Sequence, residues 1–193
     1  MNQEMAAFFD ALAPAWDHAP AEYETREKLV SLMGLSQNSV IADIGCGKGV
    51  LFEHLLKTDP AKIIAVDASG EMIRLAAERC SDHRLAYVHG DFLDVALPML
   101  DAAVFFNSYP HFLEKEALAE KLSRALKKGG AMIIAHSLGK TKINEMHKSE
   151  SVSKFSTPLE SAAVEANQFQ EFFAIDTLID SDEIYFIKMT RRC

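Results

Sequence analysis

Residues 40–49, with the sequence VIADIGCGKG, constrain the fold of this chain more than any other segment. The apolar run around Asp43 is typical of a buried strand, and it leads directly into a Gly-x-Gly-x-Gly turn that opens a helix. Glycine at alternate positions lets the backbone bend sharply and lets a ligand approach the main chain closely. The segment therefore predicts a strand, a turn and a helix arranged to hold a nucleotide-like ligand.

Beyond this turn, strands of the buried type alternate with helices. Apolar runs without polar alternation predict strands at 62–66, 85–88, 102–106 and 131–135. Helical patterns separate these strands, at 50–57, 70–79 and 115–126. We expect Gly129 and Gly130 to stop the last of these helices. Such alternation predicts an α/β fold with a parallel sheet between helices, in which ligands bind beyond the carboxyl ends of the strands.

The length of 193 residues suits one domain with a substantial core. Within the single domain, 1–193, we expect four parts in chain order. They are a helical cap at 1–34, a ligand-binding core at 35–136, an insertion over the ligand side at 137–157, and a helix with a closing strand pair at 158–193.

The composition limits which partners we expect the protein to bind and in which compartment we expect it. A net charge of -8 argues against a nucleic-acid backbone as partner. No apolar stretch approaches the length of a membrane span, and the N-terminal residues lack the pattern of a secretory signal. The three cysteines have no metal-like spacing and are expected to be reduced thiols. We therefore expect a cytoplasmic monomer or homodimer with no metal, membrane or nucleic-acid partner.

The sequence of the turn excludes two common kinds of nucleotide-binding site and favours a different ligand. A dinucleotide fingerprint would have a third glycine where Val50 stands, and a P-loop would follow Lys48 with Ser or Thr rather than Gly49. Asp67 lies about 20 residues beyond the turn, where an acid can bind ribose hydroxyls. Asp43 favours a cationic ligand over a pyrophosphate, because like charges repel. A ribose, a positive centre and no phosphate describe S-adenosylmethionine.

The chain resembles the class I S-adenosylmethionine-dependent methyltransferases of the small-molecule type. The motifs VIADIGCGKG, IIAVDAS, GDF and LKKGGAMII, within residues 40–135, carry the resemblance. It implies a three-layer, Rossmann-like α/β sandwich with a mostly parallel seven-stranded sheet whose last strand is antiparallel. Residues 9–17 are more loosely similar to a segment that helps close the cofactor pocket in members such as the quinone-biosynthesis C-methyltransferases.

The resemblance also implies which residues hold the cofactor. In that family the glycine turn wraps the methionine part, acids after the second and third strands bind ribose and adenine amine, and neighbouring side chains flank the adenine ring. The matching positions are Asp43, Gly45, Gly47 and Gly49 in the turn, Asp67 for the ribose, Ala68, Met72 and Phe92 beside the ring, Asp91 at its amine, and Asn107 near the transferred methyl group. We add Cys46, which lies within the turn; a small side chain that fits between two glycines explains this residue at least as well as a reactive thiol.

Methyl transfer from a sulfonium asks little of the protein beyond aligning a nucleophile and excluding water, although some nucleophiles need a base. Candidate bases follow the fourth and fifth strands, at Tyr109, His111 and His136, and each also has an ordinary structural explanation. His147, in the insertion, is better explained by ordinary helix packing.

The sequence says least about the molecule that would accept the methyl group. Enzymes that methylate amino groups of nucleic acids and some proteins carry Asn/Asp-Pro-Pro-aromatic after strand four, and the segment from Asn107 to Pro110 departs from this pattern. With the acidic composition, this favours direct displacement onto a small-molecule acceptor. A methyltransferase acting on RNA or protein stays open, as does a regulatory or scaffold protein that binds S-adenosylmethionine without transferring its methyl group.

Overall fold

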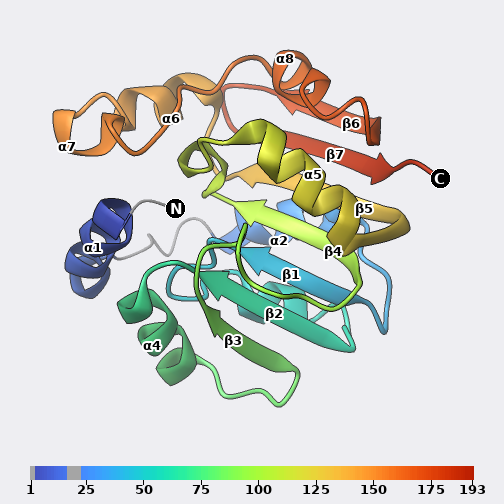
Figure 1. The fold of residues 1–193 in the computed structure, drawn as a ribbon, viewed down its shortest axis with the longest axis horizontal. Helices are drawn as coiled ribbons and strands as arrows, with labels where there is room; N and C mark the ends of the chain where they lie inside the picture. Colours follow the sequence, from blue (N-terminus) through green and yellow to red (C-terminus); the bar gives the residue numbers. More distant parts are fainter. Residues whose placement is uncertain (1–2, 17–22) are drawn as a thin grey trace.

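A computed structural model describes residues 3–16 and 23–193, so residues 1–2 and 17–22 of the expected N-terminal cap lie outside the described residues. The centre is a seven-stranded sheet with strand order β3-β2-β1-β4-β5-β7-β6 (Figure 1). The strands are β1 (Val40–Ile44), β2 (Lys62–Asp67), β3 (Leu85–His89), β4 (Leu100–Phe106), β5 (Leu126–His136), β6 (Phe173–Asp180) and β7 (Tyr185–Arg191). The pairings of β7 with β5 and with β6 are antiparallel and the other four pairings are parallel, which confirms the expected mostly parallel sheet.

Helices cover both faces of this sheet. They are α1 (Gln3–Leu12), η1 (Ala13–Ala15), α2 (Tyr23–Met33), α3 (Phe52–Leu56), α4 (Gly70–Arg79), η3 (Tyr109–His111), α5 (Lys115–Ala125), α6 (Lys140–Met146), α7 (Glu150–Ser153) and α8 (Ala162–Asn167). One hydrophobic cluster joins the sheet to α5 and α8, and a second joins its other face to α2 and α3. These two clusters make the three-layer, Rossmann-like sandwich that the sequence predicts.

The strand β1 shows why the sheet is buried on both faces. Ile41 packs in one hydrophobic cluster while Ala42 and Ile44 pack in the other, because successive side chains point to opposite faces. The arrowheads of β1, β2 and β4 point toward the side of the molecule where α1 and α6 lie (Figure 1). The loops that follow these strands therefore gather beside the two helices.

The glycine pair after α5 differs from the expectation. The helix already ends at Ala125, and Gly129 and Gly130 lie inside β5, where the β4–β5 register shifts. A Cβ on Gly130 would lie 2.9 Å from the carbonyl oxygen of Lys127 and 3.2 Å from that of Asp101. The pair was predicted as a helix stop, but it accommodates an irregularity between two strands, where only glycine permits so close an approach.

Candidate active site

A cavity of about 270 Å³ lies beyond the carboxyl ends of β1, β2, β4 and β5, with α1 and α6 completing its wall. Most of the residues that the sequence singles out contribute to this wall, namely Gly45, Cys46, Gly47, Asp67, Ala68, Met72, Phe92, Asn107, His111 and His136. Four others do not, namely Asp43, Gly49, Asp91 and Tyr109. The fold thus brings together residues that are nearly a hundred positions apart, as expected at the open edge of a parallel sheet.

The glycines of the turn have different neighbours. Gly45 and Gly47 line the cavity, and the nearest atom to a Cβ built on Gly47 is the Met72 sulfur, at 4.0 Å. A Cβ on Gly49 would lie 2.2 Å from the Phe52 ring, so this glycine allows the turn to pack on α3. Gly47 therefore keeps the turn's backbone accessible to a ligand, whereas Gly49 has a structural role.

Asp67 ties the end of β2 to the glycine turn. Its Oδ2 accepts a hydrogen bond from the Gly47 backbone N–H at 2.8 Å, and its Oδ1 accepts one from the Ser69 N–H at 2.9 Å. Burial raises the pKa of this carboxyl, and the two hydrogen bonds oppose that shift. Since each carboxylate oxygen has a second lone pair, Asp67 can still accept bonds from two hydroxyls of a ribose.

Asp43 lies behind the turn and does not face the cavity, which differs from the expected direct contact with a cationic ligand. The residue is 1% exposed, and neither of its carboxylate oxygens has a hydrogen-bond partner in the part of the chain that the structure describes. Burial, and then the nearby charge of Asp67, raise the pKa of Asp43 to about 7. Asp43 can therefore act on a ligand only as a buried charge at short range.

Of the residues expected around the adenine ring, some line the cavity and one lies outside its wall. Ala68, Met72 and Phe92 line the cavity, and the Ser69 hydroxyl caps α4 by accepting a hydrogen bond from the Met72 N–H at 3.1 Å. Asp91 lies outside the wall, and its Oδ1 accepts a hydrogen bond from the Leu93 N–H at 2.9 Å. The three residues predicted to flank the ring therefore line the cavity, whereas Asp91, predicted to meet the adenine amine, accepts a hydrogen bond within its own loop.

Asn107 is fixed in the cavity wall by the strand beside it. Its Nδ2 donates to the Ser137 Oγ at 3.0 Å, and its Oδ1 accepts from the Ser137 backbone N–H at 3.0 Å. The neighbouring Ser108 hydroxyl donates to the carbonyl oxygen of Ile44 at 2.7 Å and ties this loop to β1. Sequence reasoning gave neither serine a role, because each acts through a partner from another strand.

Tyr109, predicted as a candidate base, is directed away from the cavity. Its hydroxyl donates to Glu165 Oε2 at 2.7 Å, and the Lys115 Nζ lies 3.4 Å from the centroid of its ring. Burial, and then the charge of Glu165, raise the pKa of Tyr109 far above its ordinary value. Tyr109 therefore belongs to the core between η3 and α8, and we withdraw it from the candidate bases.

Three histidines converge on the cavity from different elements. His111 lies in η3, His136 ends β5, and His147 follows α6. The ring centroids of His111 and His147 are 5.1 Å apart. Burial lowers the pKa of His111 to about 4 and that of His136 to about 3, and it also lowers the pKa of His147. All three imidazoles are therefore neutral at pH 7.

His111 has a defined orientation. Its Nδ1 lies 2.9 Å from the carbonyl oxygen of Phe155, a pure acceptor, so we assign the proton to Nδ1 and the lone pair to Nε2. A lone pair at Nε2 is what a base needs.

His147 lies in the cavity wall, although the sequence favoured ordinary helix packing for this residue. Ile143 and Met146, which belong to the preceding helix, line the cavity with it.

The helix α1 covers the cavity and is anchored by Asp10. The Asp10 Oδ1 accepts hydrogen bonds from the Ser69 Oγ at 2.6 Å and the Glu71 backbone N–H at 3.0 Å, at the N-terminus of α4. The ring of Phe9, which directly precedes Asp10, lies 5.0 Å from the His111 ring. Sequence reasoning missed the role of Asp10, because its partners are about sixty residues away.

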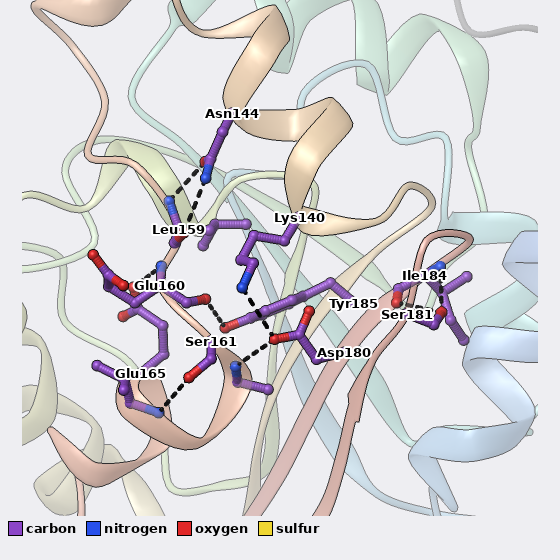
Figure 2. Close-up of polar contacts among 12 residues, drawn as sticks. Lys140, Asn144, Leu159, Glu160, Ser161, Glu165, Asp180, Ser181, Ile184 and Tyr185 are labelled. Carbon is purple, nitrogen blue, oxygen red and sulfur yellow. Dashed lines mark hydrogen bonds and ion pairs between the residues drawn. The ribbon is translucent and has the colours of Figure 1, made fainter.

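The helix α6 is held over the other side of the cavity by the contacts in Figure 2. The Asn144 side chain donates to the Leu159 carbonyl oxygen at 2.9 Å and accepts from the Leu159 N–H at 2.8 Å. The Lys140 ammonium lies 3.5 Å from Asp180 Oδ2, which also accepts from the Ala162 N–H at 3.1 Å. These contacts join both turns of α6 to the C-terminal part of the fold and fix His147 relative to the sheet.

The residues present fit S-adenosylmethionine. Asp67 offers two oxygens to ribose hydroxyls, Met72 and Phe92 contribute apolar surface to the cavity wall, and the backbone of Gly47 is accessible. In the described ranges, no group of three His, Cys, Asp or Glu side chains is arranged to hold a metal ion. In the same residues, no helix is both long and apolar enough to cross a membrane.

Comparisons with known proteins find similarity to methyltransferases. Residues 41–130 match the family model described as a methyltransferase domain. A malonyl-[acyl-carrier protein] O-methyltransferase of Priestia megaterium is 29% identical over 145 residues, which cover 74% of this chain and 52% of that protein. The chain spans about half or less of the length of the curated relatives that it matches.

Two solved structures share the whole fold. The N-methyltransferase NodS of Bradyrhizobium japonicum, in complex with S-adenosyl-L-homocysteine, superposes with a TM-score of 0.73 at 15% identity and covers 97% of both chains. A SAM-dependent methyltransferase of Aquifex aeolicus has a TM-score of 0.74 at 16% identity, covering 96% of this chain and 98% of that one. The matched domain spans the glycine turn, Asp67 and the start of β5, so over these residues the chain is similar to methyltransferase domains, and it shares the Rossmann-like fold of S-adenosylmethionine-dependent methyltransferases.

Proposed function

We propose that this protein transfers a methyl group from S-adenosylmethionine to a small-molecule acceptor by direct displacement. The observation that carries the proposal is the covering of the cavity by α1 and α6, which places Phe9 and Ile143 in the same wall as Asp67 and His136. A cavity whose entrance is narrowed by two covering helices suits a compact acceptor better than RNA or a folded protein, which would need a wider approach. The four-part division of the single domain, with its cap and insertion, is part of this proposal.

The proposed donor site lies at the β1–β2 side of the cavity. Asp67 would accept hydrogen bonds from the ribose, Met72 and Phe92 would enclose the adenine, and the turn at Gly45 and Gly47 would hold the methionine part. When bound, S-adenosylmethionine supplies a methyl group that its sulfonium has already activated. Asn107 is held by two hydrogen bonds to Ser137, so it can position the reacting groups without rearrangement.

The proposed acceptor site lies at the β4–β5 side. Phe9, Phe112 and Ile143 exclude water, which favours attack by the acceptor over hydrolysis. His111 Nε2 is the candidate base for an acceptor that enters with its proton, and His136 lines the same side.

The three free cysteines are consistent with the reducing cytoplasm that we propose as the compartment. We propose that the protein acts as a monomer or a homodimer.

Calorimetry with S-adenosylmethionine and S-adenosylhomocysteine tests the donor site. We expect both to bind, and we expect Asp67→Ala to weaken both while Asp94→Ala, an exposed acid in a nearby loop, leaves them unchanged. Binding of neither compound by the unaltered protein would refute the proposed function. Binding without formation of S-adenosylhomocysteine across a broad panel of small acceptors would instead favour a cofactor-binding protein.

A further inference from the structure

Charged side chains are confined to one part of the cavity wall. Asp67, at the end of β2, is the only Asp, Glu, Lys or Arg of the wall among the described residues. Lys115 and Glu165, on α5 and α8, do not line the cavity and are bound to Tyr109 instead. A charged acceptor at the β4–β5 side would lose its water without gaining an opposite charge, and burying an unpaired charge is costly. This side of the cavity therefore suits a neutral acceptor.

Rings of the wall form a row at this side. The Phe9 ring centroid lies 6.0 Å from that of Trp16 and 5.0 Å from that of His111. The His111 centroid lies 5.1 Å from that of His147, and all four residues of this ring row line the cavity. Aromatic rings attract one another in offset or edge-to-face arrangements beyond the effect of buried area. The ring row therefore favours a flat aromatic ligand over a saturated one of similar size.

The ring row also offers a hydrogen-bond acceptor. The Nδ1 of His111 lies 2.9 Å from the Phe155 carbonyl oxygen, so Nε2 holds the lone pair. The ring nitrogens of the wall that are buried without a partner are those of His136 and His147, and His111 Nε2 is not among them. We therefore take His111 Nε2 as the nitrogen that a ligand can reach. A neutral ligand pairs with it by donating a proton, as a hydroxyl does.

We propose that the methyl acceptor is a neutral aromatic ring bearing a hydroxyl group, which packs against the ring row and donates to His111 Nε2. The inference rests on the proposed function and names its substrate class. The hydroxyl oxygen forms a bond to the methyl carbon as the bond between that carbon and sulfur breaks, giving an aryl methyl ether and S-adenosylhomocysteine. The hydroxyl proton passes to His111 Nε2 and then to water. A phenol, with a pKa of about 10, is neutral at pH 7 and becomes a stronger nucleophile as it loses this proton.

The test measures the binding of small probes to the protein saturated with S-adenosylhomocysteine. Phenol is compared with cyclohexanol, which lacks the flat ring, with toluene, which lacks the hydroxyl, and with the charged probes benzoate and benzylammonium. Ligand-observed NMR measures each dissociation constant, and the emission of Trp16, the single tryptophan, reports binding at the ring row. We expect phenol to bind at least about tenfold more tightly than either charged probe, and about two- to tenfold more tightly than cyclohexanol or toluene.

Variants test the two contacts separately. Phe9→Leu keeps an apolar side chain but removes a ring, so most of the preference for phenol over cyclohexanol should be lost. Phe8→Leu is the matched control and should keep that preference, because the Phe8 ring lies 5.3 Å from that of Phe155 and is not part of the cavity wall. His111→Phe keeps a ring but no lone pair, so the preference for phenol over toluene should disappear.

Each comparison has an outcome that would overturn the inference. A charged probe, cyclohexanol or toluene that binds as tightly as phenol would exclude the proposed class of acceptor, and so would binding of none of the probes. Failure to bind S-adenosylhomocysteine would overturn the proposed function instead.

Discussion

The Asp67 carboxylate accepts a hydrogen bond of 2.8 Å from the Gly47 backbone N–H, so the end of β2 holds the turn that follows β1. One residue thereby shapes the glycine turn and presents oxygens to the cavity. Replacing Asp67 by Ala removes both contributions, and we expect cofactor binding to weaken by about 1–3 kcal/mol. Calorimetry measures the change, with Asp94→Ala as control, and an unaltered dissociation constant would exclude Asp67 from the ribose site.

Gly49 and Gly129 offer a matched test of the turn. Both have positive φ, 74° and 76°, but an added Cβ meets the Phe52 ring at 2.2 Å in one case and nothing within 4 Å in the other. We expect Gly129→Ala to cost about 1 kcal/mol of backbone strain, and Gly49→Ala to cost about 1–3 kcal/mol more from overpacking. Urea unfolding measures both, and equal losses would contradict the proposed packing role of Gly49.

Burial of Asp43 predicts an unusual pH dependence of stability. Its pKa is raised from 3.8 to about 7 in the folded protein, so the folded state binds more protons than the unfolded state between these values. The stabilisation is complete below about pH 4 and is lost as the pH rises through about 7, by on the order of 4 kcal/mol.

The Asp43→Asn variant has no carboxyl at this position and therefore lacks this pH-dependent stabilisation. Its free energy of unfolding should vary less with pH between about 4 and 7 than that of the unaltered protein. Chemical denaturation of the cofactor-free protein at several pH values measures the difference. Parallel curves for the two proteins would show that Asp43 is already ionised in the fold.

Tyr109 and His111 are two residues apart but should respond differently to mutation. Tyr109→Phe removes a donor to buried Glu165, so we expect a loss of stability of about 1–3 kcal/mol with turnover per folded molecule retained. His111→Asn should keep cofactor affinity and, for an acceptor that enters with its proton, lower turnover by about a hundredfold or more. Turnover assays on the folded fraction decide, and the opposite pattern would restore Tyr109 as the base.

Asp10 links the covering helix to the cofactor site. Its bonds to Ser69 and Glu71 lower its pKa below 3.8, so they favour docking of α1 above that pH and lose this effect as the pH falls through the lowered value. Asp10→Ala should release α1, redden the emission of Trp16, the single tryptophan, and weaken cofactor binding about tenfold. Unchanged emission and affinity would show that α1 docks without this residue.

The local motifs were readable from the sequence because their function depends on neighbours in the chain. The strand around Asp43, the turn through Gly47 and the acid at Asp67 act within about 25 residues of one another, and a buried strand followed by glycine has few alternative folds. These features predicted the sheet and the side of it on which the cavity lies.

The rest of the site depends on contacts that no local pattern reveals. Tyr109 points away from the cavity because of its place in η3. Residues three apart share a face of a 3₁₀ turn, so Ser108 and His111 face the cavity together, whereas Tyr109, which lies between them in the chain, does not. His147 reaches the cavity only because Asn144 and Lys140 hold α6 against segments that follow it in the chain.

The central claim is methyl transfer from S-adenosylmethionine to a small molecule at this cavity. It is tested most directly by incubating the purified protein with a cell extract and S-adenosylmethionine labelled in the methyl group, then separating low-mass from macromolecular products. We predict label in the low-mass fraction, and its loss with Asp67→Ala. Label in protein or RNA, or transfer to neither fraction, would contradict the account.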